Sequence, residues 1–331
     1  MDNRYKNKSL LITGGTGSFG KNFLKYTINH KIHFKKIIIF SRDEFKQYEM
    51  AKEFSISKYP FLRYFLGDIR DKERLQRALD DVDIVVHAAA LKQVPMAEYN
   101  PWEFIKTNII GSENVINTSL DSTVSKVIAL STDKAAAPVN LYGATKLCSD
   151  KLFIAANNIV GKKNKAFSVV RYGNVMNSRG SVIPLFKKQK ENRLLTITDE
   201  EMTRFNISLD DSVKMVLWSI ENLVGGEILV PKIPSYRIMD LAKAIAPNAK
   251  YKISGIRPGE KIHEELITKT DSDYTYDLGS YYAIVADSCT LKFLKKFSKV
   301  KKVTKNFYYA SNNNTKFLSV KELQKLLKDH S

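Results

Sequence analysis

Two short segments in the middle of the chain carry side chains suited to proton transfer. Thr132, Asp133 and Lys134 place a hydroxyl, a carboxyl and an amine next to one another. Tyr142 and Lys146 follow, four residues apart, so on a helix they share one face. A tyrosine with its reference pKa of about 10 is a poor base at neutral pH, but a neighbouring ammonium favours its phenolate. We therefore predict that Tyr142 accepts a proton from a substrate hydroxyl and that Lys146 assists it.

A glycine-rich loop near the start of the chain is the second chemical feature. Between a predicted strand and a predicted helix it reads Thr13-Gly14-Gly15-Thr16-Gly17-Ser18-Phe19-Gly20. Glycine allows a tight turn and lets backbone N–H groups approach a pyrophosphate, which then sits at the positive end of the helix. The loop thus predicts a dinucleotide site. Its expected cofactor contacts are Gly14, Thr16, Gly17, Ser18, Phe19 and Gly20.

The end of the second predicted strand bears on which dinucleotide binds. Ser41, Arg42, Asp43 and Lys46 lie there. An acid at this place accepts a hydrogen bond from the ribose 2′-hydroxyl of NAD, whereas an arginine with a nearby lysine favours the 2′-phosphate of NADP. We predict NADP, with NAD as the alternative because Asp43 could still accept from the ribose. In a third interpretation Arg42 and Lys46 are only surface charges.

Two further loops follow later predicted strands. Asp68 and Ile69 come after the third strand, where the Asp68 carboxylate suits an adenine amino group. Ala88, Ala89 and Ala90 come after the fourth strand, where small side chains leave room for a flat cofactor. Alternatively, Asp68 caps a helix and the alanines only pack. Their place beside the glycine-rich loop favours cofactor contact.

The elements that must position these residues alternate along the first half of the chain. Short apolar runs predict strands, each followed by a segment with helical periodicity, such as 19–30 and 101–120. This βαβ repetition predicts an α/β fold with a doubly wound parallel Rossmann sheet. Strands are expected at 10–13, 37–40, 64–66, 84–87, 127–130 and 169–171. We predict a dinucleotide-binding domain over 1–174, to which parts of the later chain return, and a smaller α/β substrate-binding domain over 175–331.

The composition argues against several other classes of protein. Hydrophobic residues make up 44% and charged residues 27% of the chain, as in ordinary globular proteins. Two cysteines without metal-ligand spacing argue against disulfides and metal sites, and no apolar run approaches the roughly 20 residues of a membrane span. The net charge of +18 comes mostly from scattered lysines without a nucleic-acid-binding motif, so we expect an anionic nucleotide ligand and no nucleic acid. The cysteine usage and the lack of an apolar leader predict a cytoplasmic protein.

Two segments near the C-terminus are expected to form amphipathic helices. In the lysine-rich run 292–305, lysines at helical spacing predict a solvated face, with Phe293 and Phe297 on another face. A surface for acidic partners is the alternative interpretation of this run. The segment 320–327 carries a stripe of leucines that is expected to pack on the body.

These motifs together resemble the extended short-chain dehydrogenases. They are particularly similar to the members that carry out 4,6-dehydration of UDP-N-acetylglucosamine with inversion at C5. The resemblance covers nearly the whole chain, and Asp133-Lys134 is its most specific part, because epimerases and retaining dehydratases typically carry other residues there. The matching segments are 13–20, 41–46, 88–95, 131–134, 141–146, 171–174, 178–182, 202–205 and 257–261.

The resemblance implies a hydro-lyase that recycles its NADP internally. Oxidation at C4 acidifies the C5 proton, which Lys134 would remove while Asp133 protonates the departing C6 hydroxyl. Tyr142, Lys146 and Thr132 complete the implied catalytic set. Asp133 can act as an acid near pH 7 only if its surroundings raise its pKa. In the alternative interpretation Asp133 and Lys134 are only an ion pair at a strand end.

The resemblance also assigns ligand contacts outside the central motifs. Lys92, Thr107 and Val175 are expected beside the cofactor, and Lys92 also near the sugar. Ala137 and Asn177 depart from the family pattern, which often has Asn at the first place and Gly or Ala at the second, so the exact sugar and the outcome at C5 stay open. The contacts implied for the UDP-sugar are Asn174, Ile183, Thr196, Arg204, Arg257 and Glu260.

Other functions remain open at the level of the sequence. A UDP-sugar 4-epimerase or a C5-retaining 4,6-dehydratase would share the glycine-rich loop and Tyr142 without needing Asp133-Lys134. A regulator that senses NADP without turnover is a third hypothesis, against which the intact catalytic residues argue. Arg204 could tie the two domains together instead of binding substrate. The family further implies a homo-oligomer, either dimer or hexamer, and a product used for pseudaminic-acid-type sugars in protein glycosylation.

Overall fold

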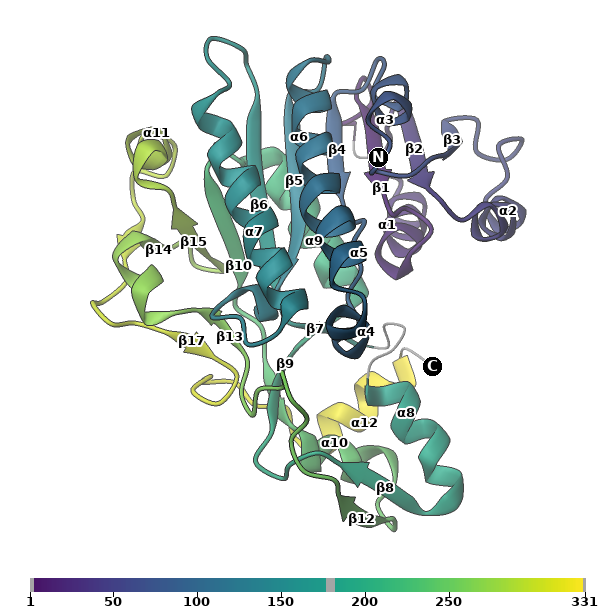
Figure 1. Cartoon of the computed structure of the whole chain (residues 1–331), viewed down its shortest axis with the longest axis vertical. Coiled ribbons are helices and arrows are strands. Elements are labelled where there is room, and N and C mark those ends of the chain that lie inside the picture. Colours follow the sequence, from purple (N-terminus) through teal and green to yellow (C-terminus); the bar gives the residue numbers. More distant parts are fainter. Residues whose placement is uncertain (1–2, 177–181, 330–331) are drawn as a thin grey trace.

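A ten-stranded, mostly parallel sheet forms the centre of the protein (Figure 1). The computed structural model describes residues 3–176 and 182–329. Within them the strand order is β16-β14-β15-β10-β6-β5-β4-β1-β2-β3, and neighbouring strands from β3 to β10 run parallel. The predicted doubly wound α/β fold is confirmed. The strands are β1 (Ser9–Thr13), β2 (Lys36–Ser41), β3 (Leu62–Leu66), β4 (Ile84–His87), β5 (Lys126–Thr132), β6 (Ala166–Tyr172), β10 (Glu227–Pro231), β14 (Thr275–Asp277), β15 (Tyr281–Val285) and β16 (Lys301–Lys302).

Helices cover both faces of this sheet. On one face α6 (Gly111–Leu120) packs between α3 (Lys72–Ala78) and α7 (Leu141–Ala155), and on the other α1 (Ser18–Asn29) packs against α9 (Leu209–Asn222). The helix α2 (Glu44–Glu53) lies beside β3, and α4 (Val94–Tyr99) and α5 (Pro101–Phe104) precede α6. In the part of the chain that the structure describes, we find no helix with the length and apolar character needed to cross a bilayer.

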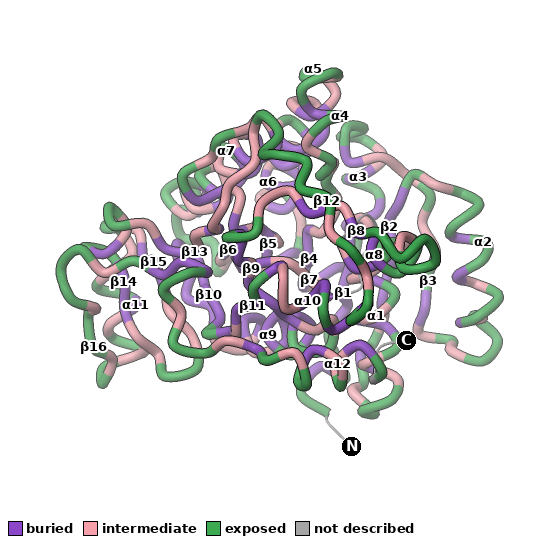
Figure 2. Tube along the Cα trace, turned by 90° about the horizontal axis from the view of Figure 1, so that it is seen from below, coloured by how far each residue is buried: buried purple, intermediate pink, exposed green. Residues whose placement is uncertain are grey.

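Nearly continuous apolar strands explain why the sheet needs cover on both faces. Leu10, Ile39 and Val86, from β1, β2 and β4, are fully buried, and the interior of Figure 2 is correspondingly coloured as buried. Strands without a polar face are typical of parallel sheets, in which both surfaces contact helices. The sheet and its helices therefore form one large core.

A smaller lobe with its own core lies beyond the carboxyl edge of the sheet (Figure 1). Phe186, Leu241 and Leu323 from three helices are buried in that core. The helical leucine stripe predicted for 320–327 is thus confirmed, because α12 packs on α10. The elements of this lobe are α8 (Val182–Gln189), β8 (Leu194–Ile197), β11 (Ser235–Arg237), α10 (Ile238–Ile245), β12 (Lys250–Ile253) and α12 (Val320–Asp329). Four short strands connect the lobe to the sheet, and Phe205, Leu266 and Tyr309 from three of them are buried in the core of the sheet. These strands are β7 (Asn174–Val175), β9 (Thr203–Ile207), β13 (Glu265–Ile267) and β17 (Tyr309–Ala310).

The second half of the chain contributes more to the sheet than a boundary at residue 174 suggests. Strand β10 adds to β6 in parallel, and β15, β14 and β16 extend the sheet with antiparallel pairs. All five residues of β10 are buried, so this strand requires partners on both sides. The smaller lobe is consequently made of 182–202 together with 235–262 and 318–329. Helix α11 (Thr290–Lys296) ends within the lysine-rich run and buries Phe293.

A π-helical turn interrupts the continuous helix that the sequence predicts over 101–120. The turn η1 (Ile105–Ile110) connects α5 to α6. It points the buried Asn108 side chain at the loop after β4, where Asn108 Oδ1 accepts from Leu91 N–H and Nδ2 donates to Leu91 O, each at 2.9 Å. Nδ2 also donates to Thr145 Oγ1 in α7 at 3.0 Å. The π turn therefore fixes this loop against the helix that carries the predicted catalytic pair.

A buried polar chain lies beneath the glycine-rich loop. Thr13 Oγ1 accepts from the Ala89 N–H at 3.2 Å and lies 2.8 Å from His87 Nδ1. His87 Nε2 is 3.3 Å from Ser112 Oγ, which in turn lies 2.8 Å from Ser149 Oγ. A neutral imidazole satisfies this arrangement, because one ring nitrogen accepts and the other donates. Burial, followed by the charge of Lys146, lowers the His87 pKa to about 3.

We expect acid to weaken the fold through His87. The unfolded chain binds a proton at this imidazole near pH 6.5, whereas the folded protein does so only near pH 3, so the stabilisation is complete above pH 6.5 and is lost as the pH falls. At about 1.4 kcal/mol per pH unit, roughly 2 kcal/mol of the free energy of unfolding should be lost between pH 6.5 and pH 5. Urea unfolding at both pH values measures this difference. His87→Asn should reduce it and the exposed control His30→Gln should not; equal pH dependence in all three proteins would contradict the assignment.

Candidate active site

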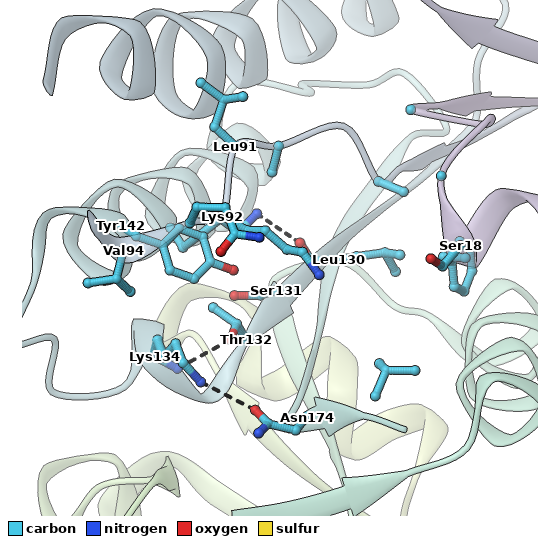
Figure 3. Close-up of a pocket in the computed structure, with 18 of the residues that line it drawn as sticks. Ser18, Leu91, Lys92, Val94, Leu130, Ser131, Thr132, Lys134, Tyr142 and Asn174 are labelled. Carbon is cyan, nitrogen blue, oxygen red and sulfur yellow. Dashed lines mark hydrogen bonds between the residues drawn. The ribbon is translucent and has the colours of Figure 1, made fainter. Parts of the chain in front are cut away.

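A cavity of about 1130 Å³ opens between the carboxyl edge of the sheet and the smaller lobe (Figure 3). Open α/β sheets bind ligands at this edge, beside the point where the strand order reverses, which here lies between β1 and β4. With the exceptions of Gly20, Asp133 and Ile183, every residue predicted to act in catalysis or binding lines the cavity wall. The structure thus brings together segments that are far apart in sequence. Asn177, a departure from the family pattern, lies outside the described residues.

The glycine-rich loop forms one end of the cavity. Gly14 has a φ of +63°, and a Cβ there would lie 2.8 Å from Ala89 Cα, so the two cofactor loops touch at this point. A Cβ on Gly20 would overlap the carbonyl oxygen of Gly15. Gly20 therefore allows close packing of the helix on the loop, and it does not line the cavity. Helix α1 has Gly17 as its N-cap, no side-chain cap and no acid in its first turn. Its free N–H groups therefore fit an anionic pyrophosphate.

Charges at the end of β2 border the same part of the cavity. Asp43 is the N-cap of α2, where it accepts from Lys46 N–H at 3.0 Å and also pairs with the Lys46 ammonium. Arg42 is half-exposed, and its Nη1 lies 3.8 Å from Asp68 Oδ2. Asp68 is also held by Arg70, whose Nη2 donates at 2.7 Å. Asp43 and Asp68 thus have partners in the protein, whereas the Arg42 guanidinium is the more available group.

Tyr142 (Figure 3) and Lys146 share the cavity-facing side of α7, as their spacing predicts. The Lys146 ammonium, however, donates to Leu130 O at the end of β5 at 2.8 Å, a contact that the spacing alone does not predict. Burial raises the Tyr142 pKa to about 12, against opposing effects of the Lys134 charge and a Thr132 hydrogen bond. In the protein alone the phenol is therefore protonated at neutral pH, and a positively charged ligand beside it is needed to favour the phenolate.

Asp133 and Lys134 begin a short 3₁₀ turn directly after β5. The Lys134 ammonium donates to Asn174 Oδ1 at 3.4 Å (Figure 3) and to Asp133 Oδ1 at 3.0 Å. Asp133 is completely buried, and burial raises its pKa, with the Lys134 charge acting in the opposite direction. The raised pKa is the condition that an acid role for Asp133 requires. Lys134 lines the cavity and Asp133 lies immediately behind it.

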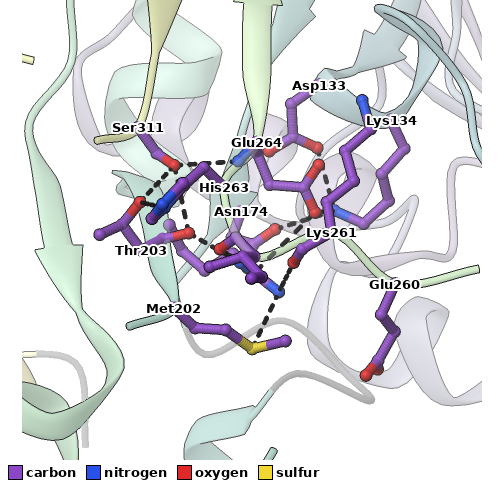
Figure 4. A network of polar contacts seen from close by, with 12 residues as sticks. Asp133, Lys134, Asn174, Met202, Thr203, Glu260, Lys261, His263, Glu264 and Ser311 are labelled. Atoms are coloured by element: carbon purple, nitrogen blue, oxygen red, sulfur yellow. Dashed lines mark hydrogen bonds and ion pairs between the residues drawn. The ribbon is translucent and has the colours of Figure 1, made fainter. Parts of the chain in front are cut away.

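Glu264 completes this cluster, although no motif in the sequence points to it (Figure 4). Its Oε1 lies 3.2 Å from Lys134 Nζ and 3.8 Å from Arg204 Nε, and its side chain is buried. Burial acts to raise the Glu264 pKa, but the charges of Lys134 and Arg204 outweigh it and the pKa is lowered. The charges of Asp133 and Glu264 likewise overcome burial and raise the Lys134 pKa. No spacing motif links residues 130 positions apart, so the sequence offers no signal for this contact.

The predicted nucleotide-sugar contacts lie on the side of the smaller lobe. Asn174 and Thr196 line the cavity, whereas Ile183 is buried in the core of the lobe and leaves the wall to its neighbours in α8. Arg257 and Glu260 form an ion pair at the cavity rim. Of the predicted contacts with the sugar nucleotide, Ile183 is thus the one that does not line the cavity.

Arg204 lines the cavity and also links β9 to the segment 261–262. Its Nη1 donates to Ile262 O at 2.8 Å and its Nη2 to Lys261 O at 2.9 Å. Lys261 Nζ in turn donates to Ala136 O, in the catalytic loop, at 2.8 Å.

The residue after Ala136 has an unusual backbone conformation. Ala137 has a φ of +45°, which asparagine tolerates better than alanine. This gives a backbone reason for the Asn found there in the family pattern.

Comparisons with known proteins agree with this arrangement. The profile of the family described as polysaccharide biosynthesis protein matches residues 10–286. The chain is 56% identical to a UDP-N-acetylglucosamine 4,6-dehydratase (inverting) of Campylobacter jejuni subsp. jejuni, over 98% of both chains. It is 44% identical to a UDP-glucose 4-epimerase of Rickettsia akari, over 98% of this chain and 96% of the relative. The X-ray structure of Pen from Bacillus thuringiensis superposes with a TM-score of 0.89 at 36% identity, covering 99% of both chains.

Proposed function

Because this chain belongs to the polysaccharide biosynthesis protein family, we propose that it is a UDP-N-acetylglucosamine 4,6-dehydratase that inverts C5. The observation that carries the proposal is the Asp133–Lys134 pair, an acid with a raised pKa in contact with an amine at the wall of a cavity that also holds Tyr142. The product would be UDP-2-acetamido-2,6-dideoxy-beta-L-arabino-hex-4-ulose. The high identity to relatives of this name supports the same reaction.

The residues at the glycine-rich end of the cavity fit a nicotinamide dinucleotide. The uncapped start of α1 would hold its pyrophosphate, and the small loop Ala88–Ala90 leaves room for its flat rings. Bound there, the cofactor supplies the redox chemistry, accepting hydride from C4 and returning it to C6. We infer that NADP is preferred over NAD, since Arg42 is available for a 2′-phosphate while Asp43 is engaged by Lys46.

The side chains of the catalytic cluster would then move three protons. Tyr142 accepts the proton of the C4 hydroxyl as that carbon is oxidised. Lys134, in its neutral form, removes the C5 proton next to the new ketone, and Asp133 protonates the C6 hydroxyl, which leaves as water. Transfer of one proton from Lys134 to Asp133 along their 3.0 Å hydrogen bond yields the required base and acid together. A further proton, derived from solvent, is added to C5 from the opposite face and inverts that centre.

The test is proton NMR of the purified protein with UDP-N-acetylglucosamine in D2O, without added reductant. A new C6 methyl signal with deuterium at C5 and the coupling pattern of the inverted ring would support the proposal. The Rickettsia relative makes 4-epimerisation the second candidate, and a spectrum of UDP-N-acetylgalactosamine would favour it. An unchanged substrate with bound cofactor would count against both enzymes and favour the sensor hypothesis.

Replacing Arg42 by alanine is expected to reduce the preference for NADP. A guanidinium contact to a phosphate contributes about 1.5–3 kcal/mol, so NADP affinity should fall about 10- to 100-fold while NAD affinity stays within a factor of three. Titration of both cofactors by fluorescence or calorimetry measures this. Arg77→Ala, at an exposed position in α3, is the matched control. An equal loss for NAD and NADP would contradict a 2′-phosphate contact.

We further propose the wider setting that the family implies. The product would feed the synthesis of pseudaminic-acid-type sugars for protein glycosylation, in the cytoplasm. Assembly of the chain as a dimer or hexamer is expected through the helices that follow β4 and β5. Light scattering of the purified protein tests the assembly.

A further inference from the structure

The Lys134 ammonium lies between two buried carboxylates. Asp133 Oδ1 is 3.0 Å from Nζ on one side, and Glu264 Oε1 is 3.2 Å away on the other (Figure 4). Both side chains are almost fully excluded from solvent. Since both acids contact a single nitrogen, they are close enough for their negative charges to repel each other.

The hydrogen bonds of the cluster indicate where a proton is held. Asp133 Oδ2 and Glu264 Oε2 are both buried without a hydrogen-bond partner among the described residues. An ionised buried carboxylate needs donors for its oxygens, whereas a protonated one needs fewer. Glu264 has a second cation nearby, Arg204 at 3.8 Å, whereas the second partner of Asp133 is the neutral Thr132 hydroxyl, which donates to Oδ1 at 3.0 Å. When Lys134 passes a proton to Asp133, the negative charge that remains therefore resides on Glu264.

The position of Glu264 is fixed by the chain around it. Its N–H donates to Ser311 Oγ at 3.0 Å, and its carbonyl accepts from Ser311 N–H at 2.8 Å. Ser311 Oγ lies 2.7 Å from Thr203 Oγ1 in β9. Directly after Glu264, the strand β13 begins at Glu265. A residue anchored on both backbone groups can hold an ammonium at a defined place with little loss of entropy on binding.

We propose that Glu264 is a positioning residue of the dehydration step, whose carboxylate pairs with the ammonium that Lys134 becomes on taking the C5 proton and lets Asp133 retain the proton it donates to the C6 hydroxyl. This inference rests on the proposed 4,6-dehydratase function and assigns a role that the sequence motifs do not contain. Glu264 lines the cavity beside Lys134 and Arg204, and it acts through Lys134. The remaining groups that influence the charge of Asp133 are Tyr142 and Thr132.

The central test replaces Glu264 by glutamine, which keeps the shape and removes the charge. Without the neighbouring negative charge the Asp133 pKa should fall, so Asp133 loses its proton at lower pH and the alkaline limb of the kcat profile should move down by about one pH unit. We expect kcat to fall on the order of 100-fold with KM within a factor of three, because substrate binding is not altered. Glu264→Asp should restore part of the activity. Glu265→Gln, at the next residue and the first of β13, is the control and should behave as wild type.

A second measurement is independent of turnover. In the infrared spectrum at neutral pH, the wild-type protein should show a protonated carboxyl band that is absent in Asp133→Asn and lost or weakened in Glu264→Gln. An unchanged band and an unshifted pH profile in Glu264→Gln would overturn the inference, whatever the loss in rate. If the wild-type protein shows the band but does not dehydrate UDP-N-acetylglucosamine, the proposed function fails while the charge arrangement stands.

Discussion

Lys134→Ala should abolish dehydration while leaving the first oxidation intact. The variant lacks the amine that removes the C5 proton, and general base catalysis of this kind contributes about 10²–10⁴-fold, so product formation should fall by about 10³-fold. Tyr142 remains in place, so C4 oxidation can still proceed once per bound cofactor. Incubation in D2O should then show almost no deuterium at C5, while single-turnover absorbance still reports reduced nicotinamide.

Two comparisons make the Lys134 result specific. Lys162→Ala removes an exposed lysine and should match wild type in every assay. Cofactor titration of Lys134→Ala should give the wild-type affinity, because Lys134 contacts Asp133, Glu264 and Asn174 and no part of the glycine-rich loop. Rapid C5 exchange in Lys134→Ala would identify another base and refute this assignment.

Tyr142→Phe should stop the reaction one step earlier. The substitution removes only the phenolic oxygen that accepts the C4 hydroxyl proton, and about a 10³-fold loss is expected. Neither reduced nicotinamide nor C5 exchange should appear, since the C5 proton is not acidic before C4 is oxidised. The pattern differs from that of Lys134→Ala, in which only exchange is lost.

The pH dependence of the first oxidation provides a check on Tyr142. Burial raises its pKa to about 12 in the protein alone, so without a bound cation the phenolate would be scarce at neutral pH. If cofactor charge favours the phenolate, the rate of C4 oxidation should rise with pH through an inflection well below 12 and then level off. The exposed control Tyr274→Phe should keep this profile. Retained oxidation in Tyr142→Phe would assign the proton acceptor elsewhere.

Local patterns predict the catalytic elements well, because their chemistry depends on neighbours in sequence. The strand before Thr132 and the helix with Tyr142 and Lys146 stand where the apolar runs and the spacing place them. The glycine-rich motif predicts a tight turn, and the structure gives Gly14 and Gly20 steric reasons to exclude a side chain. The reaction named for the two Campylobacter jejuni relatives agrees with the reaction that these motifs indicate.

Features that depend on distant segments could not be predicted in this way. Glu264 reaches Lys134 only because β13 is anchored to a strand near the C-terminus, and a single sequence does not reveal that pairing. No residue type in the segment 105–110 signals a π turn, and the Leu91 backbone that Asn108 contacts there lies in another loop. Ile183 is apolar, as a residue beside the uridine would be, but an apolar residue can equally be buried in the core of the smaller lobe, where Ile183 lies.

The bond between Ser311 and Glu264 has a consequence for how this protein is made. After Lys134 has been added to the growing chain, about 180 more residues must be synthesised before Ser311 can bind the Glu264 backbone. Nascent chains grow at roughly 5–20 residues per second, so the strands β1 to β6 and their helices are made well before the acid cluster is complete. Prematurely terminated chains that end before Ser311 should consequently bind cofactor without dehydrating sugar, and they would compete with finished enzyme for the cofactor pool.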